Sequence, residues 1–330
     1  MEFSLTTLGS ASARPTSDRF PSAHSLVVGG RLFLIDCGEG CQMQMARFKV
    51  PFSRLDNIFI SHLHGDHVFG LFGLISTLDM IGRLSPLHIY APEGLGEILG
   101  NISKSFGEVK YEIVLHTVKC KGPTLVCEFK NLEIYAFPLR HRIETYGYLF
   151  REKEPQLNII KSAIAEYKLS LEEIASLKRG EDVLRDGTLL PFKELTYKPF
   201  EPRSFAYCSD TGPFPKLKEW IRGTDLIYHE ATYASDLKAL SKTTAHSTSE
   251  DAAKVALEAG AKTLVVGHFS SRYRSLDLLL DEARKIFPET YLAQEGMKFE
   301  VPLQENPIRT NNEKPHYTAF RMRSGHSIKC

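Results

Sequence analysis

The sequence predicts an α/β protein built from layered sheets and helices, and three observations support this. Short apolar strands alternate with helical patterns through the first part of the chain, with brief connections between them. Four of the predicted strands end in an acidic residue, a histidine or both, as expected where functional groups gather along one edge of a sheet. The chain has 330 residues, 42% of them hydrophobic, so it can bury a large core.

Composition and charge narrow the functional class. The formal net charge is +1, so the molecule as a whole is no general binder of polyanions, and any contact with nucleic acid must come from a local patch. Residues Met1–Leu5 lack the basic start and long apolar core of a signal peptide, and no apolar run reaches the roughly 18 residues of a membrane span. Six cysteines without a CxxC pair indicate reduced thiols, so we expect a cytoplasmic protein.

The N-terminal part of the chain predicts three strands and one helix. The strands are expected over Glu2–Leu8, Ser25–Val28 and Arg31–Ile35, with a Gly29-Gly30 hairpin turn between the last two, and the helix over Cys41–Lys49. The third strand runs into Asp36. For this carboxylate we favour a bond to a backbone group or a ligand histidine over a direct catalytic role.

Ser61 to His67 carries the strongest functional signal, an HxHxDH motif formed by His62, His64, Asp66 and His67. The motif follows an apolar strand at 57–60 and precedes an apolar stretch at 68–75. Imidazole and carboxylate groups crowded at the end of a strand are typical of a metal site for zinc, other transition metals or manganese. A polar turn that is merely rich in histidine is the alternative, and four such side chains in six positions argue against it.

The middle of the chain continues the alternation and then changes character. We expect a helix over 93–106 and strands over 87–90, 111–116, 125–129 and 132–137. His141 follows the last of these strands, a favoured place for a ligand. From Arg151 to Pro202 the sequence is highly charged and adds no clear strand, which indicates a protruding arm or a lid. Its one predicted helix, Leu171–Leu177, ends at Lys178 and Arg179, which are either phosphate contacts or a solvated helix end.

Three strands in the second half end in ligand-type side chains. They are the strands 204–208, 226–228 and 263–266, which lead to Asp210, to His229 and Glu230, and to His268. His246 lies in a loop before a helix over Glu250–Ala259, for which Ser247 or Thr248 is the expected N-cap. A last strand is expected at Met297–Val301.

These motifs together resemble the metallo-β-lactamase superfamily and, in their finer details, its ribonuclease Z family of tRNA 3′-processing endonucleases. The finer details are Pro15-Thr16-x-x-Arg19, His229-Glu230-Ala231-Thr232, Ala245-His246-Ser247-Thr248 and Gly267-His268-Phe269-Ser270-x-Arg272-Tyr273. The resemblance implies a four-layer αββα sandwich as the catalytic domain over 1–301, with an inserted exosite arm over 151–202 that grips tRNA. A polar tail follows over 302–330. The arm departs from the family in lacking its Gly-Pro.

The resemblance also implies a role for each ligand. His62, His64 and His141 would bind one ion, Asp66, His67 and His268 would bind a second, and Asp210 would bridge the two. The ions, zinc with manganese as the alternative, would activate a water for phosphodiester hydrolysis. Asp66 would hold or receive the water proton, and His246, oriented by Glu230, would protonate the departing 3′-oxygen.

By the same resemblance we expect a homodimeric endoribonuclease that removes the 3′ trailer from precursor tRNA, with no organic cofactor and no membrane contact. The residues expected to contact the substrate are Thr16, Arg19, Phe269, Arg272, Lys178 and Arg179. Two alternatives stay open. One is another hydrolase of the same fold, acting on a small phosphodiester, a sulfate ester or a thioester. The other is a catalytically silent protein that docks RNA.

Overall fold

The computed structural model describes residues 2–306, and the chain divides into two compact units. The larger unit comprises the residues up to Lys153 and those from Pro202 to Leu303. The smaller unit spans Glu154–Glu201 and, at the end of the described chain, Gln304 to Asn306. Most of the polar tail predicted over 302–330 lies outside the described residues.

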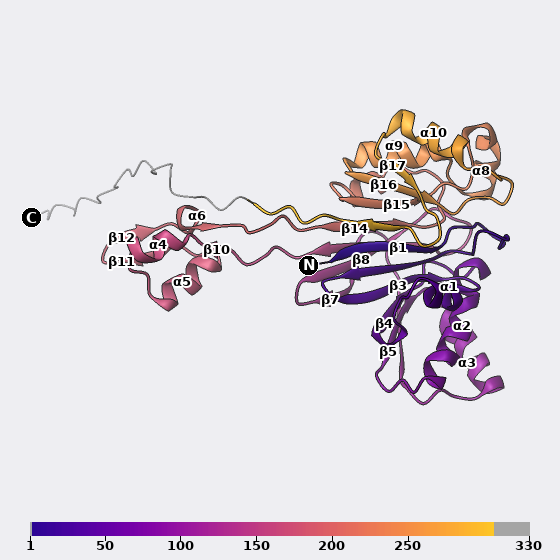
Figure 1. Ribbon diagram of the computed structural model, residues 1–330, viewed down its shortest axis with the longest axis horizontal. Helices are drawn as coiled ribbons and strands as arrows, with labels where there is room; N and C mark the ends of the chain where they lie inside the picture. The colour runs from indigo at the N-terminus through magenta and orange to yellow at the C-terminus, as the bar shows by residue number, and fades with distance from the viewer. Residues whose placement is uncertain (1, 307–330) are drawn as a thin grey trace, which may run out of the picture. The chain divides into compact units, whose positions relative to one another are not determined.

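Two seven-stranded sheets form the centre of the larger unit (Figure 1). The first sheet contains, in spatial order, β18 (Lys298–Glu300), β1 (Phe3–Gly9), β2 (Ala23–Val28), β3 (Arg31–Cys37), β4 (Leu55–Phe59), β5 (Leu87–Ala91) and β6 (Ile113–Thr117). The second contains β17 (Thr290–Leu292), β16 (Thr263–Gly267), β15 (Leu226–Glu230), β14 (Ser204–Cys208), β9 (Tyr146–Glu152), β8 (Leu132–Pro138) and β7 (Thr124–Phe129). Strands β3 to β6 are parallel to one another, as are β14 to β17.

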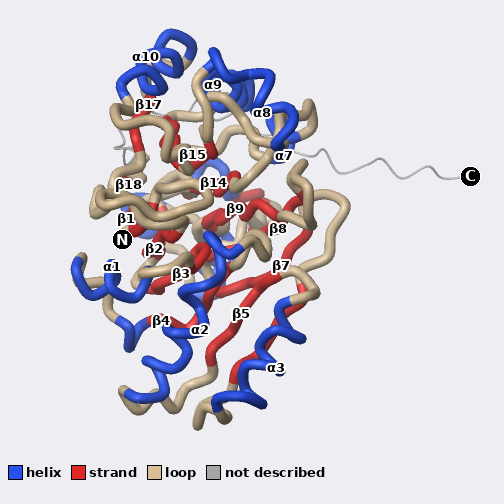
Figure 2. Tube along the Cα trace, turned by 90° about the vertical axis from the view of Figure 1, so that its right-hand side faces the viewer, coloured by secondary structure: helices blue, strands red, loops and turns tan. Residues whose placement is uncertain are grey.

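Helices cover the outer face of each sheet, which gives four layers (Figure 2). The first sheet packs against α1 (Cys41–Arg47), α2 (Gly65–Met80) and α3 (Leu95–Phe106), with a short 3-10 turn, η1 (Phe52–Arg54), before β4. The second packs against α7 (Leu217–Trp220), α9 (Ser249–Ala259) and α10 (Asp277–Ile286), and η2 (Ser235–Leu237) leads into α8 (Lys238–Thr244). The predicted αββα sandwich is therefore confirmed. No helix within residues 2–306 has the length and apolar character needed to cross a membrane.

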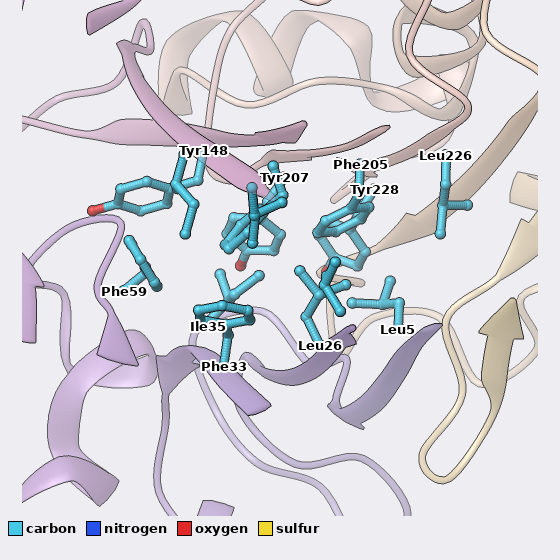
Figure 3. Close-up of a cluster of buried hydrophobic side chains, with 14 of the residues drawn as sticks. Leu5, Leu26, Phe33, Ile35, Phe59, Tyr148, Phe205, Tyr207, Leu226 and Tyr228 are labelled. Carbon is cyan, nitrogen blue, oxygen red and sulfur yellow. The ribbon is translucent and has the colours of Figure 1, made fainter. Parts of the chain in front are cut away.

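The layer between the two sheets is built largely from aromatic side chains (Figure 3). Because side chains alternate along a strand, Phe33 and Ile35 of β3 join this inner core, while Leu32 and Leu34 pack towards the helices. Phe33 meets Phe150 of the second sheet at a ring distance of 5.5 Å. Both faces of the first sheet are thus buried, which holds the strand ends that carry the site rigidly in place.

Several elements of the larger unit differ from the sequence prediction. Strand β9, helices α7 and α10, and strand β17 were not predicted. In β9 the reason is Gly147, since a glycine next to a polar stretch is typical of a loop. A Cβ at this glycine would lie 2.3 Å from the Phe137 ring and 2.8 Å from the Tyr207 carbonyl oxygen. The glycine therefore marks a close approach inside a central strand.

The smaller unit contains more regular structure than the single predicted helix. Helices α4 (Lys161–Glu166), α5 (Leu171–Lys178) and α6 (Phe192–Leu195) surround two short ladders, β10–β13 (Asn158–Ile159 with Thr196–Tyr197) and β11–β12 (Val183–Arg185 with Thr188–Leu190). Six buried side chains form a core of its own: Ile160, Ala163, Leu169, Leu177, Leu190 and Leu195. Ser170 and Glu173 close a capping box at the start of α5. The predicted helix over Leu171–Leu177 is confirmed as α5, whereas α4, α6 and the two ladders were missed because they are short and lie in a highly charged segment.

Candidate metal centre and catalytic site

The HxHxDH motif occupies the turn between β4 and α2. His62 and His64 lie in the loop, while Asp66 and His67 are in the first turn of α2. Helix α2 packs closely against the turn that follows β3, because Gly70 of the helix faces Gly38 of the turn. A Cβ on Gly70 would lie 2.1 Å from the Gly38 carbonyl oxygen. A buried tyrosine of the second sheet, Tyr148, donates a 2.7 Å hydrogen bond to the Ile60 carbonyl and fixes the start of the loop.

The remaining candidate residues come from the second sheet. His141 follows β8, Asp210 follows β14, Glu230 ends β15 and His268 follows β16. Because β14, β15 and β16 are parallel neighbours, their carboxyl ends meet at one edge. His246 lies between α8 and α9, two residues before the Thr248 N-cap, which closes a capping box with Asp251.

One group of ligand-type atoms surrounds His64. Nε2 of His62 lies 3.0 Å from Nδ1 of His64, and Nε2 of His141 lies 3.3 Å from the same atom. Asp210 Oδ2 lies 3.5 Å from His62 Nε2 and 3.8 Å from His141 Nε2. Four donor atoms therefore converge on one point.

A second group lies beside the first and shares Asp210. The Nε2 atoms of His67 and His268 are 3.2 Å apart, and Asp66 Oδ2 lies 3.5 Å from the former and 3.4 Å from the latter. The other carboxylate oxygen of Asp210, Oδ1, lies 3.4 Å from His67 Nε2 and 3.2 Å from His268 Nε2. One carboxylate thus faces both groups with different oxygens.

These spacings fit divalent metal ions. Ligands placed tetrahedrally at ~2.05 Å from an ion are about 3.3 Å apart, and the distances in both groups scatter around that value. Asp210 Oδ1 is also buried without a hydrogen-bond partner, although two imidazole nitrogens lie close to it. A buried acceptor among other acceptors is costly unless a cation compensates it. The site therefore fits divalent metal binding.

Hydrogen bonds set the tautomers of three histidines so that Nε2 faces the centre. His67 bonds through Nδ1 to Asp36 Oδ2 at 2.7 Å, and His141 bonds through Nδ1 to the Ala245 carbonyl at 3.0 Å. Nδ1 of His268 lies 3.0 Å from Thr232 Oγ1, whose own proton goes to Glu230. Since each Nδ1–H is donated outward, Nε2 is the nitrogen of each ring that a bound ion would contact.

Asp36 supports the centre without lining it. Besides His67, its carboxylate accepts hydrogen bonds from the Ser61 backbone N–H at 2.7 Å, from the Ser61 hydroxyl at 2.9 Å and from the Tyr207 hydroxyl at 2.7 Å. It is fully buried and adopts a positive φ of 56°. This geometry combines both supporting roles predicted for it, a bond to the backbone and a bond to a ligand histidine.

Strained backbone concentrates around the site. Of the seven non-glycine residues with positive φ among those described, four lie at the centre: Ala13, Asp36, Ala245 and His268. Such conformations are retained where surrounding contacts over-determine them, often at functional sites. At Ala13 the constraint is a 2.7 Å hydrogen bond from its N–H to Asp66 Oδ2.

His246 and Glu230 form a buried pair next to the metal ligands. Glu230 Oε1 lies 3.0 Å from His246 Nδ1 and also accepts the backbone N–H of Ser247 and Thr211, while Oε2 accepts two hydrogen bonds from Thr232. Burial lowers the pKa of His246, but the charge and hydrogen bond of Glu230 outweigh it and raise this pKa to about 9. A protonated His246 is thereby favoured at neutral pH.

The carboxyl groups of the centre are held ionised. Burial raises the pKa of Asp66, but the charge of His67 and a hydrogen bond from His268 outweigh this and lower it below its ordinary value. Burial is likewise the largest influence on the pKa of Asp210, and the charges of His268, His67 and His62 reverse it. Both groups are therefore negative in the range where a metal site works.

A cavity of about 440 Å³ opens onto this centre. Its wall includes the candidate ligand side chains His64, Asp66, His141, Asp210 and His268, as well as His246 and the loop residues Ser12, Ala13, Pro15 and Pro21. Phe69 of α2 lies on the rim with 65% of its surface exposed, although sequence reasoning did not select it. Its exposed aromatic ring suits contact with an unstacked base.

The residues predicted to contact the substrate differ in exposure. The prediction that the Phe269 side chain contacts the substrate is wrong, because its ring is completely buried and packs into the core under the second sheet. Its backbone N–H bonds to the Ser10 carbonyl. Arg272 is exposed, and Thr16 is half-buried and accepts the backbone N–H of Arg19 at 3.0 Å. Arg19 is half-buried and donates to the Tyr273 carbonyl at 2.7 Å.

Lys178 and Arg179 lie at the end of α5 in the smaller unit. The Arg179 guanidinium is paired with both carboxylate oxygens of Glu181, at 3.0 and 2.7 Å. A phosphate would have to compete with this carboxylate, so the geometry favours the solvated helix end over a free phosphate contact.

The supporting partners were largely missed by sequence reasoning. Tyr207 and Ser61 donate hydrogen bonds to Asp36, and Thr232 Oγ1 bonds to His268 Nδ1, in each case from a different segment of the chain. Only the Thr of His229-Glu230-Ala231-Thr232 had a local signal, since it belongs to a motif that the resemblance had singled out.

Comparisons with known proteins agree with this geometry. A family model described as beta-lactamase superfamily domain matches residues 200–269, and one described as anti-Pycsar protein Apyc1 matches residues 3–156. The ribonuclease Z of Bacteroides thetaiotaomicron is 44% identical over 298 residues, which are 90% of this chain and 94% of that protein. The ribonuclease Z of Porphyromonas gingivalis strain W83 is 42% identical, covering 91% of this chain and 99% of that protein.

Among solved structures, the short form of human tRNase Z superimposes with a TM-score of 0.68 at 27% identity, covering 91% of this chain and 99% of that one. The similarity to the bacterial proteins spans nearly the whole length of both partners, including the segments that carry all the candidate ligands. The chain therefore belongs to the ribonuclease Z family.

Proposed function

We propose that this protein is a metal-dependent endoribonuclease that removes the 3′ trailer from precursor tRNA, leaving a 3′-hydroxyl on the tRNA and a 5′-phosphate on the trailer. The observation that carries the proposal is one cavity lined both by His and Asp side chains of the candidate ligand set and by His246, whose Nδ1 is bonded to the buried Glu230 behind it. The ribonuclease Z relatives, at 42–44% identity, supply the substrate class.

In this proposal two divalent ions occupy the centre. His62, His64 and His141 would hold one ion, Asp66, His67 and His268 would hold the other, and Asp210 would contribute to both. When bound, such ions lower the pKa of a water towards neutrality and offset charge on the phosphodiester oxygens. Zinc suits the imidazole-rich set best, and manganese is the alternative.

The protein's own groups then position and move protons. Asp66 Oδ2, held by the Ala13 N–H and kept ionised, is placed to hold or receive the proton of the attacking water. Glu230 engages Nδ1 of His246, which leaves Nε2 to protonate the 3′-oxygen as it departs. Because Glu230 makes five hydrogen bonds in total, the His246 ring is held in one orientation.

Ligand-type atoms of Asp210, His246 and His268 also lie close together and form a third group with the residue types of a metal site. The 3.0 Å bond of His246 Nδ1 to Glu230 argues against it, because its distance to Asp210 Oδ2 is 3.9 Å. We therefore assign His246 to proton transfer and not to metal binding.

The remaining parts of the proposal follow the family. The arm expected over 151–202, most of which is the smaller unit, grips the tRNA, and the protein acts as a cytoplasmic homodimer without an organic cofactor. Thr16, Arg19 and Arg272 are the residues near the catalytic cavity that we assign to substrate contact.

The test is cleavage of precursor tRNAs with and without an encoded CCA by the purified full-length protein, with mapping of the cut site and metal analysis of the same sample. We expect cleavage at the start of the trailer and two divalent ions per chain. Asp66→Ala should remove this cleavage. If that variant cleaves as fast as wild type, the two-metal assignment is wrong. If the wild type binds tRNA without cutting it but hydrolyses a small phosphodiester, sulfate ester or thioester, the proposed substrate is wrong.

A further inference from the structure

A second cavity, of about 340 Å³, lies beside the 10–21 loop that helps to wall the catalytic cavity. Ser12, Ala13, Pro15 and Pro21 of this loop line the catalytic cavity, whereas Ser10, Asp18 and Arg19 line the second one. The rest of its wall comes from Arg47 and Phe48 at the end of α1 and from the segment 293–295. Its volume is within the range of small-ligand sites.

Arg19 contributes an unsatisfied cationic donor to this wall. Its Nη2 donates to the Tyr273 carbonyl at 2.7 Å, whereas its Nη1 is buried and has no hydrogen-bond partner. Buried guanidinium N–H groups are normally paired, so the arrangement favours an external acceptor oxygen.

Arg47 and Phe48 add a second cation and an aromatic face. The Arg47 guanidinium lies over the Phe48 ring, 5.5 Å from its centre, so the two side chains form a cation–π pair at the edge of the cavity. The ring is held against Gly296, which has a φ of +86° and where a Cβ would lie 2.3 Å from the ring. A fixed aromatic ring with arginines beside it is a common device for binding unpaired nucleotides, with the base stacked and the phosphate paired.

The acidic side chains of the wall do not neutralise these arginines. Glu295 directs one oxygen to the Ser10 N–H and hydroxyl and to the Phe20 N–H, at 3.0 to 3.1 Å, so it braces the loop. Within residues 2–306 neither Arg19 nor Arg47 takes part in an ion pair. Both guanidinium groups are therefore available to an anion.

The position of the cavity indicates which part of the RNA reaches it. His246 protonates the 3′-oxygen of the tRNA in the proposed function, so the tRNA end occupies the His246 side of the catalytic cavity. We place the trailer along the 10–21 loop, because this loop is bonded to Asp66 through Ala13 and its residues line both cavities.

We propose that this second cavity binds a nucleotide of the 3′ trailer, with its base against Phe48 and its phosphate between Arg19 and Arg47. This inference rests on the proposed function and adds a trailer subsite to it. Binding there aligns the trailer strand after the scissile bond, so it matters for trailers long enough to reach the cavity and not for the shortest ones.

The experiment compares two precursors that differ only in their trailers, one with a single nucleotide and one with about six. Arg47→Gln and Phe48→Leu are assayed beside wild type, with Lys49→Gln as a matched control that removes an adjacent exposed cation outside the cavity. For the long trailer we expect KM to rise about tenfold, or ~1.4 kcal/mol, in both cavity variants with kcat nearly unchanged. For the single-nucleotide trailer, and for Lys49→Gln on both, we expect wild-type values.

The outcomes separate this inference from the proposed function. If wild type cleaves both precursors and the cavity variants lose nothing on the long trailer, or lose equally on both, the trailer subsite is wrong while the endonuclease stands. If wild type cleaves neither, the proposed function fails first. A nucleoside 5′-monophosphate titrated against wild type and Arg47→Gln gives a further arm. Arginine-dependent binding of the free nucleotide without any trailer-length effect would overturn the trailer assignment in favour of a free ligand.

Discussion

Asp36 Oδ2 lies 2.7 Å from Nδ1 of His67, and this buried contact ties the end of β3 to the first turn of α2. The same oxygen accepts the Tyr207 hydroxyl from the second sheet, also at 2.7 Å. One carboxylate therefore links three elements, and it fixes which nitrogen of His67 faces the centre.

The first prediction concerns this contact. Asp36→Asn keeps the shape of the side chain but removes its charge, so the His67 tautomer is no longer enforced. We expect metal affinity to fall roughly 10- to 100-fold, as is usual when a partner of a ligand histidine is lost. Titration of the metal-free protein with zinc measures it. Tyr207→Phe, which removes one of the hydrogen bonds to the carboxylate, should produce a smaller loss, and equal affinity in wild type and Asp36→Asn would contradict the supporting role.

The second prediction concerns protons released by metal binding. Burial lowers the pKa of His67, but the charges of Asp210, Asp66 and Asp36 outweigh it and raise this pKa well above its ordinary value. Without metal, both ring nitrogens of His67 are therefore protonated at neutral pH, and a bound ion must displace the proton on Nε2. Metal affinity should therefore increase with pH and decrease as the solution is acidified. Calorimetric titrations in two buffers of different ionisation heat count the protons, and Asp36→Asn, which removes one of the three charges that raise the His67 pKa, should lose part of the release.

The third prediction concerns the donor pair. The pKa of His246, about 9, depends on Glu230, and a proton donor loses activity as pH rises through its pKa. In Glu230→Gln the negative charge is gone while burial remains, so the alkaline limb of the kcat profile should move to lower pH. His246→Ala should lose roughly 10²- to 10⁴-fold in kcat. Metal content should be unchanged in both variants, and loss of metal in His246→Ala would instead make this residue a ligand.

The fourth prediction concerns the helix that carries the motif. Gly70→Ala would place a Cβ 2.1 Å from the Gly38 carbonyl oxygen, so α2 must shift away from the β3–α1 turn. We expect a loss of about 1–3 kcal/mol in unfolding free energy, measured by denaturant unfolding. Gly73→Ala is the matched control one turn later, where a Cβ meets only the tip of the Gln42 side chain, at 3.2 Å. It should be neutral or stabilising by up to ~1 kcal/mol through helix propensity. Equal losses in both variants would argue against close packing at Gly70.

Local patterns were sufficient to predict most of the central elements. The strands around Gly29-Gly30, the strand before His62 and the capped helix before Gly260 are confirmed within a few residues, because alternation, turn glycines and capping residues act over short range. The exceptions are instructive. Strand β9 was not predicted, because Gly147 is typical of a loop. Helices α4 and α6 within 151–202 were not predicted, because the segment is highly charged and its small core around Leu177 gives only a weak apolar pattern.

The sequence by itself determined which donor types are available, because the HxHxDH spacing puts three imidazoles and one carboxylate within six consecutive positions of one strand-to-helix turn. Only the tertiary structure decided which groups share Asp210, which tautomers the histidines adopt and that Phe269 is buried instead of facing the substrate. The physical reason is the separation along the chain of the residues that interact. The type of donor atom is a property of each residue alone. Burial and hydrogen-bond partners depend instead on segments that meet only when the two sheets pack, such as those of Asp36 and Tyr207, which are more than 100 residues apart.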